Sequence, residues 1–100
     1  MQISSLKALA AIAIGAVLMG APATAQNLGR YEVFGVEDGD MLKMRKGPGT
    51  GYRTVLGLPN GTVLRVKSCQ QTGSTRWCKV ALNEARGMVG YVSWAYLREY

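Results

Sequence analysis

Few side chains in this sequence could carry catalysis or hold a metal ion. Its 100 residues include six carboxylates, two cysteines and no histidine. Without histidine, Cys–His and Ser–His–Asp nucleophilic sites and the commonest zinc ligand are all missing. Glu37, Asp38 and Asp40 cluster in one predicted turn, but the spacing and distal glutamate of an EF-hand are absent, and acidic residues are common in turns. We therefore predict no enzymatic activity, no cofactor and no metal site.

Aromatic side chains form a second group that could contact a ligand. Trp77, Tyr91, Trp94 and Tyr96 all fall within about twenty residues near the C-terminal end. Each alone is more often a core residue, and together they could close one end of a small fold. Four aromatics nevertheless exceed what so small a core needs, and aromatic faces offer peptides and sugars a large contact area at low entropic cost.

The N-terminal segment has the three parts of a secretory signal peptide. A short start carrying Lys7 is followed by the apolar residues 8–19 and then by Ala23-Thr24-Ala25. A basic start, an apolar middle and an A-x-A cleavage site are typical of such signals. The apolar run is shorter than the about 20 residues that span a bilayer. We expect cleavage after Ala25, with Ala23 as the alternative, to remove residues 1–25 and leave a periplasmic or secreted protein without stable membrane insertion.

The two cysteines lie in the part expected to be exported. Removing residues 1–25 leaves 75 of the 100 residues. This is one small domain, whose core alone gives marginal stability. Cys69 and Cys78 would enter an oxidising compartment, so we predict a disulfide between them rather than two free thiols. In the chain-entropy model, closing this short loop contributes about 2–3 kcal/mol.

The predicted mature chain is basic. Loss of Lys7 leaves eleven Lys and Arg against six Asp and Glu, a net charge of +5. A basic exported domain tends to meet anionic wall polymers or lipid headgroups. Nucleic acid is not an expected partner, because this compartment does not normally present it. The basic residues form no run, so a solvated surface explains them equally well.

The remaining sequence predicts an all-β fold, a small barrel of five to six antiparallel strands. Short stretches rich in Val, Leu, Tyr and Met alternate with Gly, Pro, Asn and Asp. The strands are expected at residues 31–36, 41–45, 54–58, 62–69, 76–82 and 87–92. A short linker is expected at 26–30, a glycine-rich loop at 46–53, a polar loop at 70–75 and one helical turn at 93–96. Pro59-Asn60-Gly61 predicts a hairpin-type turn.

The register around the cysteines poses a problem. If Cys69 faces Cys78 across a simple ladder, strict alternation places Val80 on the face of Lys67 and opposite to Val66. Both valines are apolar and favour the core. Either a bulge lies near the cysteines or the strands use both faces, and both alternatives stay open.

Three segments in this strand region resemble the bacterial SH3 (SH3b) domain family. They are Leu42-x-Met44-Arg45-x-Gly47-Pro48-Gly49-Thr50-x-Tyr52, Pro59-x-Gly61-Thr62-x-Leu64-x-Val66, and Trp77-x-x-Val80 with Gly90-Tyr91-Val92-Ser93-x-x-Tyr96-Leu97. The resemblance covers about residues 31–97, in the family's order. Met44 stands where the family usually has Val, and Tyr91 where it favours Trp. The resemblance implies an exported, single-domain SH3-like barrel over residues 31–100.

The resemblance also implies candidate binding residues. SH3-like domains generally bind extended ligands in an aromatic-lined groove between the long loop and the final helical turn. Matched position by position, this implicates Tyr52, Trp77 and Tyr96, and we add Trp94 from its place in the predicted turn. Arg45, where a strand enters the glycine-rich loop, is instead expected to donate hydrogen bonds to that loop's carbonyls.

Two functions follow as hypotheses. The first is a binding module of the cell envelope that recognises the peptide or glycan of peptidoglycan, or a periplasmic protein. The alternative is a structural or assembly subunit whose aromatic face is permanently covered by a protein partner. The sequence names neither the ligand nor the oligomeric state, because a fold does not fix a function.

Overall fold

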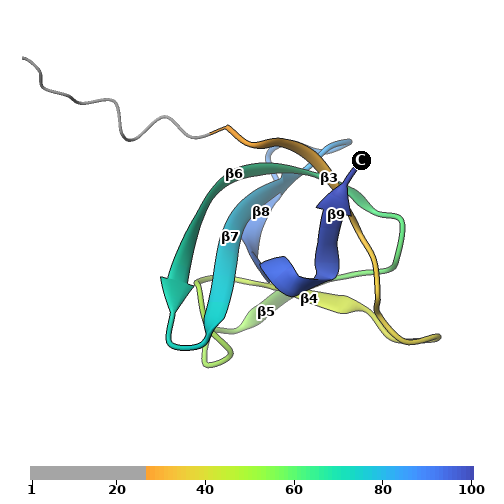
Figure 1. Cartoon of the computed structure of the whole chain (residues 1–100). Helices are drawn as coiled ribbons and strands as arrows, with labels where there is room; N and C mark the ends of the chain where they lie inside the picture. The colour runs from red at the N-terminus through yellow and green to blue at the C-terminus, as the bar shows by residue number, and fades with distance from the viewer. Residues whose placement is uncertain (1–26) are drawn as a thin grey trace, which may run out of the picture.

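The computed structural model describes residues 27–100, so the predicted signal peptide lies outside the described residues. Seven antiparallel strands form one sheet in the order β5-β4-β8-β7-β6-β3-β9, which curls into a small barrel (Figure 1). The elements are β3 (Gly29–Val33), β4 (Leu42–Arg45), β5 (Thr54–Leu58), β6 (Val63–Thr72), β7 (Thr75–Leu82), β8 (Val89–Ser93), the 3-10 turn η3 (Trp94–Tyr96) and β9 (Leu97–Glu99). The predicted all-β fold with one short helical turn near the C-terminus is confirmed.

Alternating side chains fill the barrel. In β4, Leu42 and Met44 are buried while Lys43 between them is exposed, as the apolar–polar alternation predicts. Gly90 of β8 lies against Met44, and a Cβ atom there would stand 2.4 Å from the Met44 Cγ, so the close approach of β8 to β4 requires glycine. The buried core cluster consists of Val33, Leu42, Met44, Leu58, Leu64, Val66, Cys78, Val80, Val92 and Leu97.

A β-bulge settles the register around the cysteines. Val66 pairs with Val80 and Ser68 pairs with Lys79, so Lys67 is the extra residue in β6. The bulge lets Val66 and Val80 share the core face and still brings Cys69 opposite Cys78. A disulfide joins these two cysteines, which confirms the predicted bridge.

Several element boundaries differ from those expected. The seventh strand, β9, was not predicted, and it pairs with β3 at one edge of the sheet. β3 begins at Gly29, inside the segment predicted as a linker, and ends at Val33 rather than at residue 36. It ends there because Gly35 has a positive φ of 77° and the Phe34 N–H donates to the Tyr96 carbonyl instead of to a ladder.

The β6–β7 hairpin is longer than predicted. The polar loop expected at 70–75 shrinks to Gly73 and Ser74, because the strands stay paired up to Thr72 and Thr75. Gly73, at φ 63°, has the left-handed conformation that such a tight turn requires.

The predicted turn at Pro59-Asn60-Gly61 forms, with Gly61 at φ 90°, but it does not join two paired strands. β5 pairs with β4, and β6 pairs with β3 and β7, so no β5–β6 hairpin forms.

Candidate functional site

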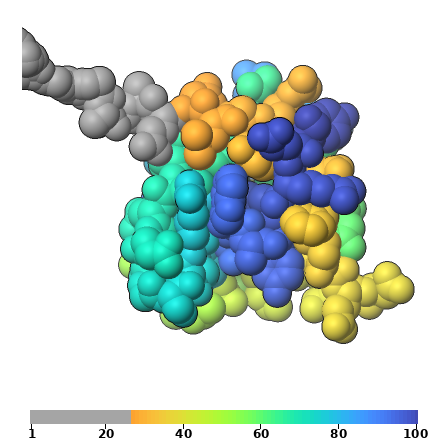
Figure 2. Space-filling model, in the orientation of Figure 1, coloured from red at the N-terminus to blue at the C-terminus, as the bar shows by residue number. Residues whose placement is uncertain are grey.

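A groove of about 550 Å³ lies on the outer side of the barrel, between the loop after β3 and the end of β8. The segment around residue 40, yellow in Figure 2, forms one side of it and projects from the body of the domain. The groove is lined by Gly35, Val36, Glu37, Asp40, Met41, Leu42, Lys43, Arg45, Thr50, Thr75, Trp77, Ser93 and Tyr96.

Trp77 forms the base of this groove. It is only 6% exposed, yet it does not belong to the core cluster. Its neighbour Cys78 points into the barrel, and successive side chains of a strand point to opposite faces, so Trp77 points outward. The Trp77 side chain points outward but has little exposed surface. The residues around the groove therefore cover its indole ring. Trp77 lines the groove and is also one of the buried hydrophobic residues of the domain, so core and groove both remain open as its role.

Tyr96 lies at one side of the groove and is far more open. Its residue is 40% exposed and belongs to η3. The Tyr96 carbonyl accepts a hydrogen bond of 2.9 Å from the Phe34 N–H, which ties the turn to the start of the opposite loop. Truncating the Tyr96 side chain would leave this backbone bond in place. Of the four candidate binding residues, Trp77 and Tyr96 are the two that line the groove.

Asn60 fixes the loop that forms the other side of the groove. Its side-chain oxygen accepts from the Val36 N–H at 3.1 Å, and its side-chain amide donates to the Val36 carbonyl at 2.8 Å. Val36 itself lines the groove. Asn60, 24 positions along the chain, therefore ties this side of the groove to the turn before β6.

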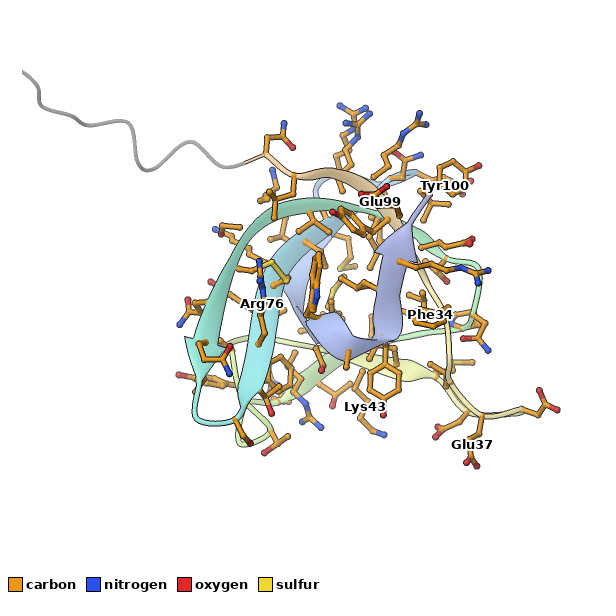
Figure 3. The ribbon with its side chains drawn as sticks, viewed as in Figure 1. Phe34, Glu37, Lys43, Arg76, Glu99 and Tyr100 are labelled. Carbon is orange, nitrogen blue, oxygen red and sulfur yellow. A yellow bond between two sulfur atoms is a disulfide. The ribbon has the colours of Figure 1, made fainter. Side chains whose placement is uncertain are left out.

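Charges of both signs line the groove. Glu37 and Asp40 come from the projecting loop, and Lys43 and Arg45 come from β4. Figure 3 shows Glu37 on that loop and Lys43 on the adjacent side of the barrel. Exposed Met41, with 50% of its surface accessible, adds an apolar contact beside them. Such a lining offers an extended ligand apolar contact along its length and partners for both ammonium and carboxylate groups.

Arg45 has the structural role that was expected of it. Its Nη1 donates to the Thr50 carbonyl at 3.1 Å and to the Tyr52 carbonyl at 2.9 Å. The Lys46 N–H and the Arg53 carbonyl close the base of the same loop at 3.0 Å. Charge-assisted hydrogen bonds are stronger than neutral ones, so Arg45 holds the glycine-rich loop in one conformation beside the groove.

Tyr52 does not line the groove. Its ring packs over Gly47, where a Cβ atom would stand 2.5 Å from the ring carbons, and it also approaches Gly49. The side chain is thus folded back over its own loop, although half of it is exposed. The close approach explains why glycine is needed at position 47, and it gives Tyr52 a loop-packing role in this structure.

Trp94 also lies apart from the groove. It is half-buried, packs against the core cluster and contacts Tyr31 with the ring centroids 5.2 Å apart. The guanidinium of Arg76 lies 4.7 Å from the Trp94 ring centroid, a cation–π geometry. Trp94 therefore closes the barrel near the β6–β7 hairpin, and its proximity to Tyr96 in sequence does not bring its ring into the same site.

Sequence reasoning missed the loop side of the groove. Glu37 and Asp40 were noted only as members of an acidic turn, and Val36 and Met41 were not singled out at all. The turn itself forms, with the Asp40 N–H donating to the Glu37 carbonyl at 2.9 Å. The sequence signal that was available is the apolar Met41 directly after the acidic turn. Across residues 27–100, no three of the His, Cys, Asp and Glu side chains are placed to hold a metal ion.

Comparison with known proteins gives one family match. The model described as "Bacterial SH3 domain" matches residues 40–98, which include β4 to β8, η3 and ten of the thirteen residues that line the groove. No curated protein and no solved structure matches the chain.

Proposed function

Because the chain belongs to the bacterial SH3 domain family, we propose that it is a non-enzymatic binding module of the cell envelope whose groove holds a cell-wall peptide. Domains of this family are generally binding modules. The observation that carries the proposal is a groove lined by both Trp77 and Tyr96, because binding hot spots are enriched in tryptophan and tyrosine.

The charges of the groove favour a short peptide with ionised groups over a neutral chain. Glu37 and Asp40 on the loop suit the ammonium group of a basic or diamino residue. Lys43 on β4 suits a carboxylate. Wall peptides carry both groups at close spacing, and the glycan attached to them would extend over the Tyr96 ring, since aromatic faces also contact sugars.

Sedimentation with purified peptidoglycan tests this function. We expect the protein to sediment with insoluble peptidoglycan, and soluble wall peptides to compete with that binding more strongly than peptide-free glycan strands. Stronger competition by glycan strands would contradict a peptide groove. A failure to sediment, together with recovery at fixed stoichiometry with one envelope protein, would favour the alternative of an assembly subunit.

We also propose that the protein works outside the cytoplasm, in the periplasm or secreted. Bacterial SH3 domains are usually extracellular or attached to the envelope, and the Cys69–Cys78 disulfide fits an oxidising compartment. Within residues 27–100, no helix has the length and apolar character that crossing a membrane requires.

Intact-mass measurement of protein recovered from the envelope fraction checks the export. We expect a chain that begins at or near Gln26, because the sequence predicts cleavage after Ala25, and that lacks two hydrogens relative to its reduced form, because Cys69 and Cys78 are joined. A mass that includes residues 1–25, or two thiols that react with an alkylating agent before reduction, would contradict this expectation.

A further inference from the structure

Two arginines face each other on the outer surface, at the end of the barrel remote from the groove. Arg30 of β3 and Arg65 of β6 are direct cross-strand partners. The neighbours of Arg65, Leu64 and Val66, are fully buried in the core, so both guanidinium groups lie on the outer face. Like charges directly opposite each other destabilise a sheet, so this pairing needs a reason.

Neither arginine forms a salt bridge with a carboxylate in the part of the chain that the structure describes. The salt bridge found within residues 27–100 joins the Arg98 Nε to the Glu32 Oε2 at 2.8 Å, which occupies the carboxylate of β3 nearest in sequence to Arg30. The Nε of Arg65 is buried and has no hydrogen-bond partner. A buried donor of a charged group that stays unpaired costs stability. A bound anion would relieve the repulsion by neutralising the two guanidinium groups, and it could pair with the terminal nitrogens of Arg65.

The residues around the two arginines are shaped for a surface contact. The guanidinium of Arg30 lies 5.4 Å from the ring centroid of Tyr100, which is 66% exposed. Leu28, two positions before Arg30 and anchored by its N–H to the Val66 carbonyl, is 40% exposed. Figure 3 shows Tyr100 at the opposite end of the barrel from Glu37 and Lys43, so this surface is separate from the groove.

We propose that Arg30 and Arg65 form a binding site for a phosphate group. Two guanidinium forks on adjacent strands can bridge the oxygens of one phosphate, and arginine suits this geometry better than lysine. The exposed leucine and tyrosine beside them favour the phosphate of a lipid headgroup, because aromatic and apolar side chains near basic residues are typical of contacts with membrane surfaces. Residues 27–100 carry eleven basic and six acidic side chains, a net charge of +5, which attracts the domain to anionic surfaces.

Vesicle sedimentation with matched charge variants tests the proposal. Vesicles of phosphatidylcholine are compared with vesicles that also contain phosphatidylglycerol, using the exported protein, its Arg30→Gln/Arg65→Gln variant and a Lys46→Gln/Arg53→Gln variant. The two variants lose the same charge, but the second loses it from the glycine-rich loop, where both residues are exposed. We expect the wild type to bind the anionic vesicles and the arginine variant to bind them roughly thirtyfold more weakly. The affinity of the loop variant for these vesicles should fall by a factor several times smaller than that.

Melting temperatures and inorganic phosphate complete the experiment. The arginine variant should melt no lower than the wild type, because its substitutions remove a repulsion, and Arg30→Gln alone tests the site if the double variant fails to fold. A different outcome is that the wild type fails to bind anionic vesicles while inorganic phosphate raises its melting temperature but not that of the arginine variant. In that case the site binds free phosphate rather than a lipid headgroup. Equal losses in both variants, or no response to either probe, would overturn the proposal.

Discussion

Replacing Tyr96 with alanine is expected to weaken binding of a wall peptide about thirtyfold or more while leaving the melting temperature nearly unchanged. Aromatic residues at a binding centre typically cost about 2 kcal/mol or more of affinity when truncated. Tyr96 is 40% exposed, and the hydrogen bond that ties η3 to Phe34 uses its backbone carbonyl, which the substitution retains. We therefore expect truncation of this side chain to affect binding more than folding.

Trp77→Ala should behave differently, although the sequence placed both residues in one class. At 6% exposure Trp77 is as buried as the core residue Leu97. Truncating a buried aromatic costs about 3–5 kcal/mol of folding stability. A domain of this size has few kcal/mol to lose. We expect this variant to lose both binding and much of its stability, so it cannot separate the two roles as Tyr96→Ala can.

Tyr100→Ala is the matched control for the groove. Tyr100 is more exposed than Tyr96 and does not line the groove, so peptide binding should persist. Equilibrium binding and thermal melting are measured on the same preparations of all three variants. If Tyr96→Ala binds as the wild type does, or melts as early as Trp77→Ala, the groove does not bind through Tyr96.

The parts of the fold that sequence predicted are those governed by local pattern. Alternation of Leu42, Lys43 and Met44 predicted a half-buried strand, and the structure buries the two apolar residues as expected. Arg45 could be assigned to the loop carbonyls because it stands where a strand enters the glycine-rich loop and carries five N–H donors. Short-range geometry decides both outcomes, so neither needed knowledge of distant residues.

The candidate site was harder, because its shape depends on contacts between distant segments. Tyr52 lies in the glycine-rich loop and Trp94 in the helical turn, as expected. Their rings, however, pack on Gly47 and Tyr31 and do not line the groove. The direction of a side chain in a loop or turn is set by tertiary packing, which periodicity does not encode. The loop side of the groove depends likewise on the hydrogen bonds between Asn60 and Val36.

The bulge at Lys67 shows how packing chooses between alternatives that a pattern leaves open. A simple ladder from the disulfide would have turned Val66 away from the core that Val80 enters. Burying one more apolar side chain outweighs the loss of regular pairing at one position, because a fully buried valine contributes about 1.5–3 kcal/mol. The extra residue is a lysine, which the bulge leaves exposed to solvent.

Removing the disulfide with Cys69→Ala/Cys78→Ala is expected to lower the stability of the domain by about 2–3 kcal/mol in the chain-entropy model, since the cysteines are separated by 9 positions. For a domain of this size that corresponds to a fall in melting temperature of about 10–20 °C. Alanine is preferred to serine because Cys78 is fully buried and a hydroxyl there would lack a partner.

The same substitution also reports on the groove, because the disulfide lies beside the residues that β7 contributes to it. Cys78 follows Trp77, and the hairpin held by the bridge also carries Thr75 to the groove. Peptide binding should therefore weaken only a few-fold at temperatures where the variant is still folded, in contrast to the loss expected for Tyr96→Ala. Reducing the wild-type protein should reproduce the fall in melting temperature, which separates loss of the cross-link from loss of the two sulfur atoms. If the variant has the same melting temperature as the wild type, the bridge adds no stability to this domain. The strand pairing of the hairpin and the core beneath it would then suffice to hold β6 against β7.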